Sequence, residues 1–245
     1  MQGQTATCEL TVLMPCLKEE DAVGACVREA LGYLQKTGLV GEVLVIDNGS
    51  TDGSAEVACR SGARVVHEPS RGYGRALRTG LAASRGSVIV MGNSDTTYDF
   101  SSLDAFVGPL RSGTCDLVIG NRFSGNSERG ASSLVHRLGA EALSALGRWR
   151  YKTDVRDFHC GLRGITQRAA SELPLETDGM EFATEMIAVA ASRGLRIAQV
   201  PIRLRRCTAQ RRSKLQAVPD GLRHVMYILS NSRRSLAGGR GRAPS

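Results

Sequence analysis

Short apolar runs alternate with helical patterns along the first half of the chain. The runs are rich in Val, Ile and Leu and end at turn-forming residues, so they predict strands. These strands are 9–15, 42–46, 64–67, 88–91 and 116–119. Apolar residues at helical spacing predict helices at 19–37, at 54–61, in a segment ending at 84, and at 103–111. Strands that alternate with helices are typical of an α/β domain with a mainly parallel, doubly wound sheet flanked by helices.

The second half of the chain has a less regular pattern. It predicts helices at 134–149, 181–192 and 221–230, a short strand or turn at 160–166, and a strand at 197–204. Pro201 has no N–H to donate, so the last strand is expected at an edge of the sheet. We divide the chain into one α/β domain at 1–204, a basic loop with an amphipathic helix at 205–236, and a disordered tail at 237–245.

The charge of the chain narrows the choice of partner. The formal net charge is +8, and most of the basic residues are Arg, whose fork matches phosphate groups. This excess suits a phosphorylated ligand or an anionic membrane surface, although a solvated basic surface explains it equally well. Only 4% of the residues are aromatic, too few for a surface that stacks single-stranded bases, so no nucleic-acid partner is expected.

The cysteines and the N-terminus bear on the compartment. The seven cysteines include no C-x-x-C pair, which argues against a zinc site or a disulfide framework and favours a reducing cytoplasm. The N-terminus has no basic segment followed by an apolar one, so no signal peptide is expected. No apolar run approaches the roughly 18 residues that a membrane span needs. We expect a cytoplasmic protein, with peripheral attachment to the membrane as an open alternative.

Two acidic loops follow strands of the predicted sheet. The loop 47–53 begins with Asp47, and the run Asn93, Ser94 and Asp95 follows the strand 88–91. Because the carboxyl ends of parallel strands open on the same edge of a sheet, both loops are expected to line one site.

At these loops the sequence resembles the family 2 glycosyltransferases of the GT-A fold. The resemblance rests on the segments 14–20, 46–53 and 93–95. The segments 71–76, 120–123, 160–163 and 179–182 extend it toward the dolichyl- and polyprenyl-phosphate mannose or glucose synthases. It covers about residues 12 to 229, and the ordered set is more specific than any one motif. It implies an inverting transfer of a sugar from a nucleotide diphosphate sugar.

The resemblance also implies a donor site and a metal. The donor residues that it implies are Pro15, Glu19, Asp47, Arg75, Asn93, Ser94 and Asp95. A Mg²⁺ or Mn²⁺ ion is expected on Asp95, where it would neutralise the diphosphate. The family pattern is Asp-x-Asp, but this chain has Asn93 at the first position, and an amide brings no charge to a metal. A homologue without activity therefore stays open as an alternative.

The acceptor site is implied in the same way. Arg122, Arg163 and Lys214 resemble residues that grip the acceptor phosphate, which makes polyprenyl phosphate the leading acceptor. A phosphate is ionised near neutral pH and needs no base, whereas a hydroxyl acceptor would use Glu181. A saccharide or small-molecule hydroxyl is thus the alternative.

Three further features remain. Glu185 is expected to be a structural partner, and His159 a partly buried polar residue rather than a metal ligand. The basic stretch 203–214 suits diphosphate, lipid phosphate or anionic headgroups. The helix at 221 either lies on a membrane or docks on the domain, and docking is the preferred interpretation.

Overall fold

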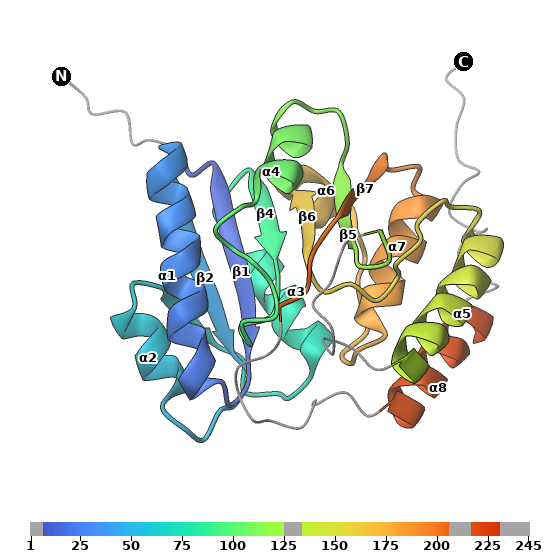
Figure 1. The fold of residues 1–245 in the computed structure, drawn as a ribbon, viewed down its shortest axis with the longest axis horizontal. Helices are drawn as coiled ribbons and strands as arrows, with labels where there is room; N and C mark the ends of the chain where they lie inside the picture. Colours follow the sequence, from blue (N-terminus) through green and yellow to red (C-terminus); the bar gives the residue numbers. More distant parts are fainter. Residues whose placement is uncertain (1–6, 125–133, 206–216, 231–245) are drawn as a thin grey trace, which may run out of the picture.

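A seven-stranded sheet with the order β3-β2-β1-β4-β6-β5-β7 forms the centre of the molecule (Figure 1). The computed structural model describes residues 7–124, 134–205 and 217–230. The strands are β1 (Leu10–Cys16), β2 (Gly41–Asp47), β3 (Arg64–His67), β4 (Val88–Met91), β5 (Leu117–Asn121), β6 (Arg163–Thr166) and β7 (Ile197–Pro201). The predicted α/β fold with a mainly parallel sheet is confirmed, and the strand with Pro201 lies at an edge.

The direction of the strands decides where their ends meet. β1 is parallel to β2 and to β4, and β5 is parallel to β7, whereas β6 is antiparallel to β4 and β5. Consequently β4 and β5 run the same way, and their carboxyl ends open on the same edge as those of β1 and β2. Because β6 runs the other way, its first residue also lies at that edge.

Helices cover both faces of the sheet (Figure 1). They are α1 (Glu20–Thr37), α2 (Ser54–Arg60), α3 (Tyr73–Ala83), α4 (Asp104–Arg111), α5 (Leu134–Tyr151), α6 (Gln167–Glu172), α7 (Phe182–Ser192) and α8 (Ala217–Ser230). The hydroxyl of Tyr33 on α1 donates to Asp104 at the start of α4, so these helices share a face, and α3 contacts α7. The sequence pattern did not predict α6, which is too short to show a helical period.

The core explains why the strands read as unbroken apolar runs. β4 is buried along its whole length, and β1 is buried except at Pro15, which is half-buried. Parallel strands covered by helices on both faces have no solvated side, so alternation of apolar and polar residues is absent. In the register of β1 and β2, Cys16 pairs with Asp47, which brings the loops after both strands together.

The last helix, α8, packs against α5 and α7. Its His224 forms a 2.8 Å hydrogen bond with Thr184 of α7, and Ile228 is buried. Helix α8 therefore docks on the domain, which was the preferred interpretation of the sequence. Met226 and Leu229 of the same helix are 64% and 62% exposed, because His224 and Ile228 make the contact. The predicted basic loop and tail fall largely on 206–216 and 231–245, outside the described residues.

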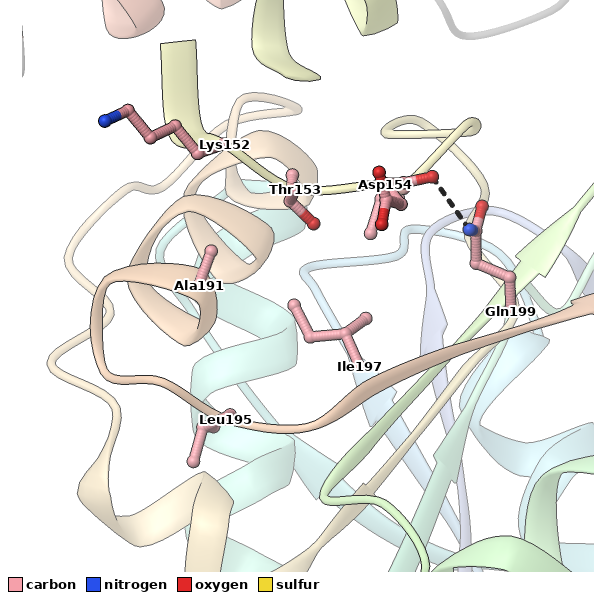
Figure 2. Close-up of a pocket in the computed structure, with 8 residues that line it drawn as sticks. Lys152, Thr153, Asp154, Ala191, Leu195, Ile197 and Gln199 are labelled. Carbon is pink, nitrogen blue, oxygen red and sulfur yellow. Dashed lines mark hydrogen bonds between the residues drawn. The ribbon is translucent and has the colours of Figure 1, made fainter. Parts of the chain in front are cut away.

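A short loop contacts Gln199 of β7 beside a hollow of about 250 Å³ (Figure 2). The side chain of Gln199 donates to the backbone oxygen of Asp154 at 2.9 Å and accepts from the N–H of Arg156 at 2.6 Å. Both hydrogen-bonding groups of this side chain are thus used by the loop. In the part of the chain that the structure describes, no helix is both long and apolar enough to cross a bilayer.

Candidate active site

The loops after β1, β2 and β4 meet at the carboxyl edge of the sheet, as predicted. The hydroxyl of Ser94 donates to the backbone oxygen of Pro15 at 3.0 Å, which joins the loop after β4 to the end of β1. The backbone N–H of Asn48 donates to Cys16 at 2.8 Å, which joins the loop after β2 to the same place. The expected donor residues Pro15, Asp47 and Ser94 therefore surround one site.

Asp47 forms a buried wall of this site. One carboxylate oxygen accepts the N–H of Ser50 at 3.2 Å, and the other lies 3.1 Å from Nδ1 of His67. Glu19, at the N-terminus of α1, is also buried, and its backbone N–H donates to Ser54 at 2.8 Å. The turn that carries Glu19 is fixed by the hydroxyl groups of Ser50 and Ser54, which accept from the N–H groups of Lys18 and Glu19.

The loop from Asn93 to Thr97 fixes the direction of the Asp95 carboxylate. Thr96 adopts a left-handed conformation with φ of 66°, and the N–H of Thr97 donates to Oδ1 of Asp95 at 3.0 Å. The hydroxyl of Tyr73 lies 3.4 Å from Oδ1 of Asn93. This contact uses the amide oxygen, and the NH₂ group of the same side chain is a donor that cannot ligate a metal.

Gly161 lies close to Tyr98 and Asn93 of the segment after β4. Its N–H donates to the hydroxyl of Tyr98 at 2.8 Å. A Cβ on Gly161 would lie 3.0 Å from that hydroxyl and 3.3 Å from the side-chain oxygen of Asn93. The glycine in the segment 160–163 therefore allows this loop to approach the motif after β4.

The glycine-rich segment 71–76 serves a packing role. Gly72 donates its N–H to the side-chain oxygen of Asn48, and Gly74 donates to the backbone oxygen of Asp178. Arg75 and Arg78 both form ion pairs with the carboxylate of Asp178. The N-terminus of α3 and Arg75 thus already have an acidic partner from the loop before α7, so the expected contact between Arg75 and the donor phosphates does not fit this arrangement.

The two glutamates near α7 have different surroundings. Glu185 is buried and accepts from the N–H groups of Glu176 and Thr177 at 3.0 and 2.9 Å, so it is the structural partner that we expected. Glu181 accepts from Gly179 at 3.2 Å through Oε1. Its Oε2 is buried and has no hydrogen-bond partner in the described residues, which leaves one carboxylate oxygen available for a proton.

Arg163 has a structural role in place of the expected phosphate contact. The residue is only 2% exposed, and its guanidinium donates to the backbone oxygens of Cys160, Ala183 and Phe158, each at 2.7 Å. Burial lowers its pKa, and an acceptor phosphate could reach it only if these bonds broke. We therefore withdraw Arg163 from the acceptor site. Lys214, the third expected acceptor residue, lies outside the described residues.

Arg122 is placed at the site edge, directly after β5. Its Nε and Nη2 donate to the two carboxylate oxygens of Asp157 at 2.6 and 2.7 Å. Asp157 was not among the residues expected from the sequence, because it lies 35 residues from Arg122 along the chain and no local pattern links the two.

His159 is close to this ion pair. Its ring meets that of His224 edge to face, with centroids 4.4 Å apart, and both ring nitrogens are buried with no hydrogen bond in the described part of the chain. Burial, with help from His224 and Arg122, lowers the pKa of His159 to about 3. The ring is therefore neutral at physiological pH. No group of three His, Cys, Asp or Glu side chains that could hold a metal occurs among the described residues.

The loops at this edge of the sheet fall within a match to one protein family. The family model described as glycosyl transferase family 2 matches residues 11–173, which include the loops after β1, β2 and β4. The chain belongs to glycosyl transferase family 2. The resemblance that the sequence motifs suggested is thereby confirmed.

Relatives within glycosyl transferase family 2 come from archaea and mycobacteria. The low-salt glycan biosynthesis hexosyltransferase Agl6 of Haloferax volcanii is 34% identical over 91% of this chain and 54% of its own length. A dolichyl-phosphate hexose transferase of the same organism is 29% identical over 79% of this chain and 82% of its own length. This chain spans about half the length of the first curated relatives that it matches.

Two solved structures are similar to this chain in fold. Glucosyl-3-phosphoglycerate synthase from Mycobacterium tuberculosis, in complex with Mn²⁺, UDP and glucosyl-3-phosphoglycerate, superposes with a TM-score of 0.71 at 26% identity. The match covers 92% of this chain and 81% of that chain. A second structure, described as a mycobacterial protein, gives a TM-score of 0.73 at 28% identity over 92% of this chain and 76% of its own.

Proposed function

We propose that this glycosyltransferase moves a hexosyl group, with inversion, from a nucleotide diphosphate sugar to a polyprenyl phosphate. The observation that carries the proposal is the position of Arg122, which follows β5 at the same sheet edge as Asp95. A clamped guanidinium beside the donor motif suits an acceptor that carries a phosphate. The dolichyl-phosphate hexose transferase among the relatives supports the same acceptor class.

The chemistry is a single displacement at the anomeric carbon. A phosphate oxygen of the acceptor forms the new bond to that carbon while the bond to the diphosphate breaks, and the nucleoside diphosphate leaves with the electron pair. The acceptor is already ionised, so no protein base is needed. Pro15, Glu19 and Asp47 would hold the nucleotide, Asn93 and Ser94 its ribose, and Arg122 the acceptor phosphate.

The residues present fit a divalent cation with one protein ligand. Mg²⁺ and Mn²⁺ keep several waters and commonly bind through one or two carboxylates together with substrate phosphates. Asp95 is the carboxylate that this loop offers, and Thr97 fixes its direction. When bound, the cation would offset the negative charge that develops on the diphosphate. The Mn²⁺ and Mg²⁺ complexes of glucosyl-3-phosphoglycerate synthase support this cofactor.

A small phosphorylated molecule with a hydroxyl acceptor is the second candidate. It is favoured by the likeness to the phosphoglycerate-dependent synthase and by Oε2 of Glu181, which has no partner within the described residues and could take the hydroxyl proton. An inactive homologue is the third. Polyprenyl phosphate would bring the protein to a membrane surface, and the exposed Trp149, Met226 and Leu229 on α5 and α8 support peripheral contact there.

The test supplies labelled GDP-mannose, UDP-glucose or UDP-GlcNAc with either a short polyprenyl phosphate or 3-phosphoglycerate. We expect label in the organic extract with the polyprenyl phosphate. If label appears only in an aqueous product with 3-phosphoglycerate, the second candidate, a small phosphorylated acceptor, is supported instead. Asp95→Ala should abolish transfer without loss of the fold, whereas Asp154→Ala, a change on the exposed loop beside β7, should not alter it. No transfer in any combination, with intact binding of nucleotide sugar, would favour the inactive homologue.

A further inference from the structure

Asp157 holds the side chain and backbone of Arg122 at the acceptor side of the site. It accepts from Nε and Nη2 of Arg122 at 2.6 and 2.7 Å and from the backbone N–H of Arg122 at 3.1 Å. The N–H of His159 also donates to this carboxylate, at 3.2 Å. Asp157 is fully buried. Two parallel hydrogen bonds to a carboxylate fix both the position and the plane of a guanidinium.

Asp157 and Arg122 are both charged in the fold without a ligand. Burial by itself would raise the pKa of Asp157, but the hydrogen bonds and the charge of Arg122 outweigh it, and the pKa is lowered. Burial likewise opposes the charge on Arg122, and the hydrogen bond with Asp157 raises its pKa above the ordinary value. Both groups are therefore ionised, and the carboxylate of Asp157 balances the charge of Arg122 without a bound ligand.

Asp157 does not bind the third guanidinium nitrogen of Arg122, Nη1. Nη1 makes no hydrogen bond to the residues that the structure describes, and it is not a buried atom. The Arg122 side chain remains 25% exposed, while its acidic partner is not exposed at all. Asp157 thus occupies one side of the guanidinium and leaves the Nη1 side for another partner.

We propose that Asp157 is a positioning residue for the acceptor: it orients Arg122 so that Nη1 meets the acceptor phosphate. The inference rests on the proposed function, in which Arg122 holds that phosphate. An arginine that is already held in one rotamer loses less freedom when the ligand binds than a mobile one does. Asp157 itself does not touch the substrate, so its removal should act through Arg122.

The first test is the steady-state kinetics of Asp157→Asn, which keeps the shape of the side chain and removes its charge. We expect KM for the acceptor phosphate to rise about tenfold or more, with KM for the nucleotide sugar and kcat little changed. Asp116→Asn is the matched control. Asp116 is also buried and accepts two hydrogen bonds from Arg196 at 3.0 Å, but it lies before β5, at the opposite end of the strand. It should leave the acceptor KM unchanged.

A double-mutant comparison separates positioning from general stability. If Asp157 acts through Arg122, Asp157→Asn should not raise the acceptor KM further once Arg122→Ala is present. Full additivity, or an equal rise in the KM values of donor and acceptor, would overturn the proposal. If Asp157→Asn does not fold, Arg122→Lys provides a second test. Lysine keeps the positive charge but has one nitrogen, so it cannot form the two parallel hydrogen bonds to the Asp157 carboxylate. An unchanged acceptor KM in that variant would also overturn it.

Phosphate binding tests the role of Asp157 separately from the proposed transfer to polyprenyl phosphate. If the wild type transfers no sugar to polyprenyl phosphate, the proposed function fails, and calorimetric titration with inorganic phosphate then tests the site alone. We expect the wild type to bind phosphate at least about tenfold more tightly than Asp157→Asn and Arg122→Ala. Equal binding by all three proteins would overturn the assignment of Asp157.

Discussion

The backbone oxygen of Asp178 accepts a 2.8 Å hydrogen bond from the N–H of Gly74, in the first turn of α3. A Cβ on Gly74 would overlap the backbone oxygen of Thr177 and lie 2.8 Å from Cβ of Phe182. The loop before α7 can approach α3 so closely because residue 74 has no side chain.

Replacing Gly74 by alanine should therefore destabilise the protein. We expect the free energy of unfolding to fall by about 1–3 kcal/mol, the usual cost of overpacking, although alanine is the better helix former. Urea unfolding measures it. Gly32→Ala is the control, since a Cβ on this residue of α1 would have no neighbour within 4 Å. It should stabilise by about 0.5–1 kcal/mol, and a similar gain for Gly74→Ala would contradict the close packing.

Loss of Arg163 should affect stability before it affects acceptor binding. Arg163→Met leaves three buried carbonyl oxygens without their donor, which should cost at least about 3 kcal/mol of unfolding free energy. Arg168→Met removes an arginine that is 64% exposed and should cost under about 1 kcal/mol. A stable Arg163→Met with a raised acceptor KM would return Arg163 to the phosphate site.

The buried imidazole of His159 should make stability depend on pH. Its pKa is about 3 in the fold against 6.5 for an unperturbed histidine, so below pH 6.5 the unfolded chain binds a proton that the folded chain does not. The contribution is fully present above pH 6.5 and is lost as the pH falls toward 3, by at most about 1.4 kcal/mol per pH unit.

Urea unfolding between pH 7.5 and pH 5 would measure this slope, in a range that lies mostly above carboxylate titration. Asp157 opposes the effect, whereas His224, Arg122 and Arg163 strengthen it. His159→Phe keeps an aromatic ring against His224 and should flatten the slope. The same slope in this variant would assign the pH dependence to other groups.

Restoring the missing carboxylate with Asn93→Asp should tighten the divalent cation. One carboxylate oxygen can accept from Tyr73 as the amide oxygen does, and the other replaces the NH₂ group with a charged ligand. Titrations of the transfer rate with Mn²⁺ and Mg²⁺ should show half-saturation at a lower concentration than in the wild type. Unchanged half-saturation would place residue 93 outside the metal shell, and transfer that is insensitive to chelator in both proteins would remove the metal from the mechanism.

The strands and the site loops were predictable because local patterns encode them. β3 and β4 begin and end where the apolar runs predicted, and the polar loops after β2 and β4 meet because parallel strands share an edge. A buried strand needs an unbroken apolar run, and this requirement is visible in a single segment.

The roles of the arginines were not predictable in the same way. Arg122 directly follows β5 and Arg163 begins β6 at the same sheet edge, yet one is paired with an acid and the other with backbone carbonyls. The difference depends on Asp157 and Ala183, which lie 35 and 20 residues away in the chain. The ion pair of Arg75 was not visible in the sequence for the same reason, since its partner Asp178 comes from a loop 103 residues later.

Pro201 at the end of β7 has a consequence for self-association. An outer strand with unsatisfied backbone groups is a template on which a second chain can extend a sheet, and such growth leads to aggregates. Proline at the last position of β7 has no N–H, so this edge strand offers one backbone donor fewer to an added strand. The 154–156 loop, which Gln199 binds through both groups of its side-chain amide, packs beside the same strand. Both features make β7 a poorer template for sheet growth.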